Sequence, residues 1–102
     1  LVPFMFAAYL QRVFHAPVVI QLSDDEKFFF KCLSLEQAGA FAAENIVDII
    51  ACGFDPDRTF IFKDTDAIGA LYPMVCQIQR RLTVGQLAKA FGVRVHSEGG
   101  EA

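Results

Sequence analysis

Polar and charged side chains gather directly after two β-rich segments of the chain. Gln21 is polar inside the otherwise apolar segment Val18–Leu22, and residues 23–27, SDDEK, follow at once. A second β-rich segment, residues 59–62, runs into residues 63–66, KDTD. Ligands of parallel α/β sheets bind beyond the carboxyl ends of the strands. These positions therefore predict a polar ligand site at the strand ends.

Each of these features also has an ordinary structural interpretation. A glutamine in a buried strand is usually satisfied by a neighbouring backbone group, and an acidic run after a strand is usually a solvated helix cap. Two aspartates and a glutamate are suitable Mg²⁺ ligands, but no further ligands accompany them. His15 and His96 have no partner at metal spacing. The sequence thus predicts no metal ligand, and it lacks the common nucleotide, protease and hydrolase signatures.

The elements that must position these residues begin with an apolar helix. Residues 2–14 are apolar until Gln11 and Arg12, which predicts a largely buried helix ended by residues 15–17. Residues 18–22 are apolar on both faces, the pattern of a strand covered from both sides in a parallel sheet. A short helix is expected over residues 28–31, preceded by the acidic run at its positive end.

The remaining elements are predicted from helix and turn signals. Ser34 and Gln37 have the spacing of a capping box, which predicts the start of an amphipathic helix that Gly53 ends. A second strand covers residues 59–62, and a helix weakened by Gly69 and Pro73 covers about residues 67–80. The final signals predict a second capping box at Thr83 and Gln86, a helix closed by Gly92, and a frayed polar tail over residues 96–102.

Two strands joined through a long amphipathic helix make a β-α-β unit with a right-handed crossover. The predicted fold class is α/β, with a parallel sheet and flanking helices.

Composition limits the function classes. The chain has 102 residues, 54% of them hydrophobic, and a net charge of -3, which describes one globular domain. Its apolar stretches are shorter than the roughly 18 residues of a membrane span. Its net negative charge argues against a domain that binds the phosphate backbone of a nucleic acid. The number and spacing of Cys32, Cys52 and Cys76 match no disulfide framework. This predicts a reducing, intracellular compartment and cysteines packed in the core. Because the sequence opens at Leu1 without a leader pattern, we expect it to begin inside something larger.

Three longer runs carry a resemblance to a known family. They are VIQLSDDEK at residues 19–27, ENIVDIIACGFD at 44–55 and TFIFKDTD at 59–66. Together they resemble tryptophanyl-tRNA synthetases of the eukaryotic and archaeal type. The likeness covers roughly residues 1–91 and is strongest over residues 21–66.

The resemblance implies a fragment of the catalytic domain of a class I aminoacyl-tRNA synthetase, with a Rossmann-like fold. It implies a cytoplasmic homodimer that activates tryptophan with ATP and Mg²⁺, joins it to tRNA, and dimerises near residues 67–81. By position, Gln21 would lie against the indole and Glu26 would meet the amino group. Lys27 and Ser23 would lie near the amino acid and the ATP phosphates.

The sequence also departs from that family. The HIGH-like and KMSKS-like signatures that handle ATP are absent, so we expect no catalytic residue here and no catalysis by the chain alone. Residues 1–95 are expected to be part of the catalytic domain, and residues 96–102 a polar tail. Two alternatives remain open: a tyrosyl-tRNA synthetase fragment, against which residues 50–55 argue, and a non-catalytic interaction module of the same fold.

Overall fold

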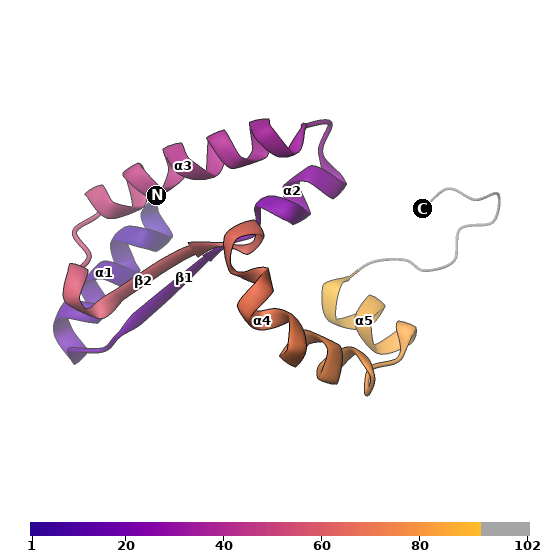
Figure 1. Cartoon of the computed structure of the whole chain (residues 1–102). Coiled ribbons are helices and arrows are strands. Elements are labelled where there is room, and N and C mark those ends of the chain that lie inside the picture. Colours follow the sequence, from indigo (N-terminus) through magenta and orange to yellow (C-terminus); the bar gives the residue numbers. More distant parts are fainter. Residues whose placement is uncertain (93–102) are drawn as a thin grey trace. The chain divides into compact units, whose positions relative to one another are not determined.

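The structure is a computed structural model that describes residues 1–92. Two units can be distinguished in it, one over Leu1–Ile68 and a second that starts at Gly69. The predicted order of helices and strands is confirmed (Figure 1). In chain order the elements are α1 (Val2–Phe14), β1 (Val18–Leu22), α2 (Asp24–Phe30), α3 (Leu35–Ala51), a 3-10 helix (Pro56–Arg58), β2 (Thr59–Lys63), α4 (Asp64–Gln79) and α5 (Val84–Phe91).

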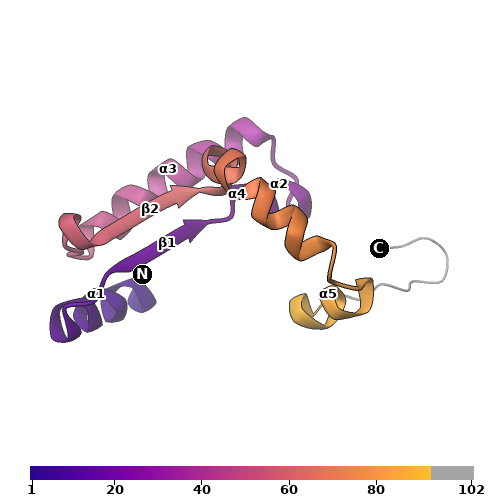
Figure 2. The same ribbon diagram turned by 60° about the horizontal axis from the view of Figure 1, so that its bottom comes forward.

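The two strands form the predicted parallel sheet, and α3 lies between them in the chain. Val18 pairs with Thr59, and the register continues to Leu22 and Lys63. Figure 2 shows the two strands pointing in the same direction. Both strands therefore end at the same edge, and residues that follow them are brought together there. The β-α-β prediction is confirmed in this unit.

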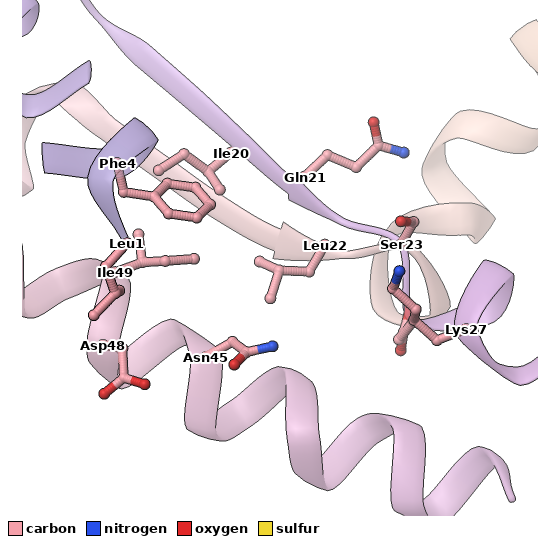
Figure 3. Close-up of a pocket in the computed structure, with 11 residues that line it drawn as sticks. Leu1, Phe4, Ile20, Gln21, Leu22, Ser23, Lys27, Asn45, Asp48 and Ile49 are labelled. Atoms are coloured by element: carbon pink, nitrogen blue, oxygen red, sulfur yellow. The ribbon is translucent and has the colours of Figure 1, made fainter. Parts of the chain in front are cut away.

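Only one face of the sheet is covered. Ile20 is buried and, with Leu22, lies toward Phe4 of α1 and the side chains of α3 (Figure 3). Side chains alternate along a strand, so Val19 and its register partner Phe60 point to the other face. They are 67% and 61% exposed, and the prediction of a strand covered from both sides is wrong for this unit.

Helix α1 is less buried than its composition predicts. Only Ala8 and Gln11 are buried, while Met5 and Phe6 are exposed. Phe4, Ala8 and Gln11 recur at helical spacing, so α1 contacts the sheet along one narrow stripe. The helix ends at His15, which adopts a left-handed conformation with φ of 50°.

Gln11 joins α1 to the amino ends of the sheet. Its Nε2 donates to the carbonyl oxygen of Arg58 at 3.2 Å and to Oγ1 of Thr59 at 2.9 Å. Its Oε1 accepts the backbone N–H of Asp55 at 2.8 Å, and the residue is only 2% exposed. All these groups are paired inside the protein, so this glutamine holds the loop before β2 against α1.

Two helices begin earlier than predicted, in both cases at an aspartate. Helix α2 begins at Asp24, so the acidic residues form its first turn and do not precede it. Helix α4 begins at Asp64 instead of near residue 67, and Pro73 lies within it. Acidic side chains are favourable beside the positive end of a helix, which explains why the acidic runs are incorporated into the first turns.

Local end signals are confirmed. Ser34 and Gln37 exchange the two hydrogen bonds of a capping box, at 2.9 and 3.0 Å, as do Thr83 and Gln86 at 2.9 and 3.1 Å. Gly92 ends α5 with φ of 66°, a conformation that favours glycine.

The core prediction for the cysteines is wrong. Cys32 and Cys76 are exposed, and Cys52 is partly exposed with its Sγ donating to the carbonyl oxygen of Asp48 at 3.4 Å. Within residues 1–92 the buried apolar side chains are mostly small; they are Ala8, Ile20, Ala38, Ala42 and Ile49. None of the helices described has the length and apolar character needed to cross a membrane. The predicted tail, residues 96–102, lies outside the described residues.

Candidate functional site at the strand ends

The predicted site residues follow strand ends that lie side by side. Ser23 is the N-cap of α2 and follows β1 directly, and Asp64 opens α4 directly after β2. Because Leu22 and Lys63 are register partners, the first turns of both helices start at the same edge of the sheet. The parallel pairing thus gathers polar groups from segments about forty residues apart.

Gln21 makes a hydrogen bond across this edge. Its Nε2 donates to Oδ1 of Asp64 at 2.7 Å, and the glutamine is exposed. Figure 3 shows its side chain on the face of the sheet opposite Ile20 and Leu22. Its register partner in β2 is Phe62. Within residues 1–92, no hydrogen bond reaches Oε1 of Gln21, so this acceptor is available to a ligand.

Asp24 is the buried member of the group, at 4% exposure. Its Oδ1 accepts the backbone N–H of Thr65 at 3.2 Å, and its Oδ2 accepts the Thr65 hydroxyl. Burial alone would raise the pKa of Asp24, but the hydrogen bonds from Thr65, together with backbone N–H groups at Asp24 and Asp25, outweigh it and hold the pKa below its usual value. Asp24 is therefore a carboxylate that joins α2 to the start of α4.

Asp64 has the opposite electrostatic character. Burial raises the pKa of Asp64, the hydrogen bond from Gln21 opposes that rise, and the neighbouring carboxyls of Asp25 and Asp24 raise it further. The net pKa lies above its usual value. The strand-end site consequently holds several acidic groups close together and places one amide among them.

Ser23, Glu26 and Lys27 occupy the first turns of α2. The Ser23 hydroxyl donates to Oε2 of Glu26 at 3.1 Å, and the backbone N–H of Glu26 donates to Oδ1 of Asp25 at 2.8 Å. Glu26 and Lys27 are exposed. Ser23 thus orients the Glu26 carboxylate. Within the described residues, Oε2 of Glu26 accepts no hydrogen bond other than the one from Ser23.

A cavity of about 400 Å³ lies under the strand ends on the side of α1 and α3. In Figure 3 the apolar side chains of Phe4, Ile20 and Leu22 face α3, and Ser23 and Lys27 lie beyond the end of β1, while the Gln21 amide points away from α3. Its lining residues are Leu1, Phe4, Ile20, Gln21, Leu22, Ser23, Asp24, Lys27, Asn45, Asp48 and Ile49.

Three of the four predicted site residues, Gln21, Ser23 and Lys27, border this cavity, and Glu26 does not. Glu26 is instead held beside them through its bond with Ser23. The sequence did not predict that Asp24 and Asp64 accept hydrogen bonds from residues of the neighbouring strand end. Their positions just after the ends of β1 and β2 were the available signal, but the pairing of Asp24 with Thr65 and of Asp64 with Gln21 depends on the strand register. Within residues 1–92 no cluster of three potential metal-binding side chains occurs.

Comparisons with known proteins identify what this arrangement is similar to. The chain is 50% identical over 95 residues to the cytoplasmic tryptophan–tRNA ligase of Homo sapiens, covering 90% of this chain and 20% of that protein. It is 51% identical over 94 residues to that of Schizosaccharomyces pombe, covering 90% of this chain and 24% of the relative. No family model matches the chain.

Solved structures agree with the sequence comparisons. The tryptophanyl-tRNA synthetase of Trypanosoma brucei is 48% identical, with a TM-score of 0.82 over 96% of this chain and 30% of that one. The enzyme of Encephalitozoon cuniculi bound to tryptophan is 38% identical, with a TM-score of 0.83 over 96% of this chain and 29% of that one.

The chain spans about a fifth to a quarter of the length of these curated relatives. Over that span its fold is that of the corresponding part of a class I tryptophanyl-tRNA synthetase, a Rossmann-like fragment with a two-stranded parallel sheet. The resemblance predicted from the sequence is confirmed. The matched relatives are named as tryptophan enzymes.

Proposed function

We propose that this chain is part of an ATP-dependent tryptophan–tRNA ligase and forms the tryptophan-contacting strand end of its catalytic domain. The observation that carries the proposal is the 50% identity to such a ligase over 90% of the chain, with Gln21 at a strand end. The free Oε1 of Gln21 is a suitable acceptor for the single N–H of an indole.

The site residues divide the recognition of tryptophan between them. Gln21 faces the indole, and Glu26 receives the ammonium group in a charge-assisted hydrogen bond worth about 1.5 to 3 kcal/mol. Ser23 orients Glu26 through its hydroxyl at 3.1 Å. Lys27 and Ser23 lie near the amino acid and the phosphates of ATP, where a lysine offsets negative charge.

The other partners are those of the whole ligase. ATP with Mg²⁺ is a substrate with its counter-ion, tRNA is the second substrate, and the ligase acts as a homodimer in the cytoplasm without a membrane. The dimer forms near residues 67–81. The isolated chain does not catalyse, because its sequence lacks the HIGH-like and KMSKS-like signatures that position ATP. Tryptophan-dependent exchange of pyrophosphate into ATP by the pure chain would refute that statement.

A pair of substitutions in the intact ligase tests the roles of Gln21 and Glu26. We expect Gln21→Leu to lower the ratio of kcat/KM for tryptophan over phenylalanine much more than Glu26→Gln does. Sites built to hydrogen-bond a polar group can reject analogues without it by factors on the order of 10⁴, and leucine removes that penalty at similar bulk. The ammonium group is common to all amino acids, so Glu26→Gln should raise KM for both substrates alike.

The result that would reject the proposal is specific. If Gln21→Leu leaves the ratio unchanged while Glu26→Gln collapses it, the roles are wrong and Gln21 is a structural amide. If the intact protein shows no tryptophan-dependent exchange at all while it is folded, the chain is an interaction module of the same fold.

A further inference from the structure

The hydrogen bond between Gln21 and Asp64 determines which end of the glutamine amide faces outward. A carboxylate has only acceptor oxygens, so the group of Gln21 that lies 2.7 Å from Oδ1 of Asp64 must be its NH₂. The amide oxygen is then turned away from Asp64. Rotating the amide by half a turn would place two oxygens against each other and leave the carboxylate unpaired.

We propose that Asp64 is a positioning residue that fixes the Gln21 amide with its oxygen toward the ligand, so that the site selects ligands carrying an N–H donor at that point. The inference rests on the proposed function for the identity of the ligand. The orientation of the amide itself depends only on the contact between Gln21 and Asp64.

Asp64 is itself held by the fold. It opens α4 immediately after β2, and the next residue, Thr65, is anchored by its backbone N–H and its hydroxyl to the buried carboxylate of Asp24. The carboxylate that orients Gln21 is thereby fixed to α2 as well as to β2. Burial and the nearby carboxyls of Asp25 and Asp24 raise the pKa of Asp64, and the hydrogen bond from Gln21 opposes that rise. The amide is thus the main favourable partner of this carboxylate.

The first test reverses the chemistry of the positioning group in the intact ligase. Asp64→Lys replaces an acceptor by a donor, which should turn the amide oxygen toward residue 64 and the NH₂ toward the ligand. We expect the ratio of kcat/KM for tryptophan over its benzothiophene analogue, in which sulfur replaces the N–H, to fall about tenfold or more. Asp64→Asn carries both an acceptor oxygen and an NH₂ donor, so it no longer forces one orientation, and we expect a ratio between those of the wild type and Asp64→Lys.

Asp66→Lys is the matched control. Asp66 lies in the same first turn of α4, and its side chain is 70% exposed. Among the residues that the structure describes, its one charged partner is Lys63 at 3.5 Å. The charge change is identical, so it should leave the ratio unchanged. A fall in the ratio with Asp66→Lys as large as with Asp64→Lys would show a general charge effect and overturn the inference.

A second measurement reads the amide without any substrate. With glutamine side chains labelled by nitrogen-15, the Gln21 signal is identified by its loss in Gln21→Leu, and its shift is followed against pH. It should titrate with Asp64 in the wild type and lose that titration in Asp64→Asn. An unchanged profile overturns the positioning role even if tryptophan is the substrate. A lost titration in a folded protein that does not activate tryptophan supports the orientation and refutes the proposed function.

Discussion

Two glutamines stand at opposite ends of the same two-stranded sheet, and their surroundings differ completely. Gln11, at the amino ends, is 2% exposed and has its NH₂ and its oxygen both paired to the loop before β2. Gln21, at the carboxyl ends of the strands, is exposed, and among residues 1–92 only its NH₂ is paired, with Asp64. A fully paired amide stabilises the fold, whereas an amide with a free oxygen is available for recognition.

We expect the largest effect when the chain is produced without the rest of the ligase proposed above, because the difference between the surroundings of Gln11 and Gln21 depends on a folded sheet. Within residues 1–92 few apolar side chains are buried, while Val19, Phe60 and many others are largely exposed. The isolated chain should therefore self-associate or remain loosely packed. Sedimentation, thermal melting and dye binding measure this, and a monodisperse chain with a sharp melt and no dye binding would contradict it.

The second prediction compares the two glutamines directly. Gln11→Leu in the intact ligase should lower the local free energy of unfolding by about 2 to 4 kcal/mol, since it leaves the Asp55 N–H and the Arg58 carbonyl without their partner. Gln21→Leu should change it by less than about 0.5 kcal/mol, because that residue is exposed. Hydrogen exchange of the Asp55 amide is the measurement. If Gln11→Leu and Gln21→Leu lowered the protection of the Asp55 amide equally, the two glutamines would not differ in their contribution to stability.

Much of the fold follows from local signals that the sequence displays. Ser34 with Gln37 and Thr83 with Gln86 are short-range pairs whose residue types and spacing determine their bonds, and both were predicted. The β-α-β order also follows from two short β-rich segments that flank one segment with helical apolar spacing. The start of α2 was misplaced because the acidic residues 24–26 suit either a cap or a first turn.

The long-range partners could not be predicted in the same way. Asp24 finds Thr65 across 41 residues, and Gln11 finds Thr59 across 48, through a strand register that no local pattern specifies. Burial was overestimated for α1 and the cysteines because apolar composition does not say which neighbours cover it. Gln21 was placed at a strand end from sequence, but its pairing with Asp64 required the structure.

The third prediction concerns the anchor beside Gln21. Asp24→Ala removes both acceptors of Thr65 and should destabilise the start of α4 by about 1 to 3 kcal/mol. Asp25→Ala is the matched control in the same turn. Exchange of the Thr65 amide should rise in the first variant and change little in the second. If the Thr65 amide stays protected in both variants, Asp24 does not anchor the start of α4 at the carboxyl ends of the strands.

The smallest effect should be the pH dependence of this end, where Asp24 and Asp64 act in opposite directions. The pKa of Asp24 is lowered in the folded protein, so its contribution is present above its usual value of about 3.9 and is lost as the pH falls through the lowered pKa. The pKa of Asp64 is raised, so the folded state holds a proton that the unfolded chain releases, and stability declines as the pH rises from about 4 through the raised pKa.

Asp64→Asn removes that decline, keeps an acceptor for Gln21, and leaves Asp66 in the first turn of α4. The measurement is hydrogen exchange of the α4 amides, corrected for the intrinsic exchange rate at each pH. The protection of these amides in Asp64→Asn should exceed that in the wild type by a margin that grows as the pH rises from 4 to 7. A difference that shrinks over that range would mean that Asp64 is stabilised as a carboxylate, and the electrostatic contrast between Asp24 and Asp64 would have to be abandoned.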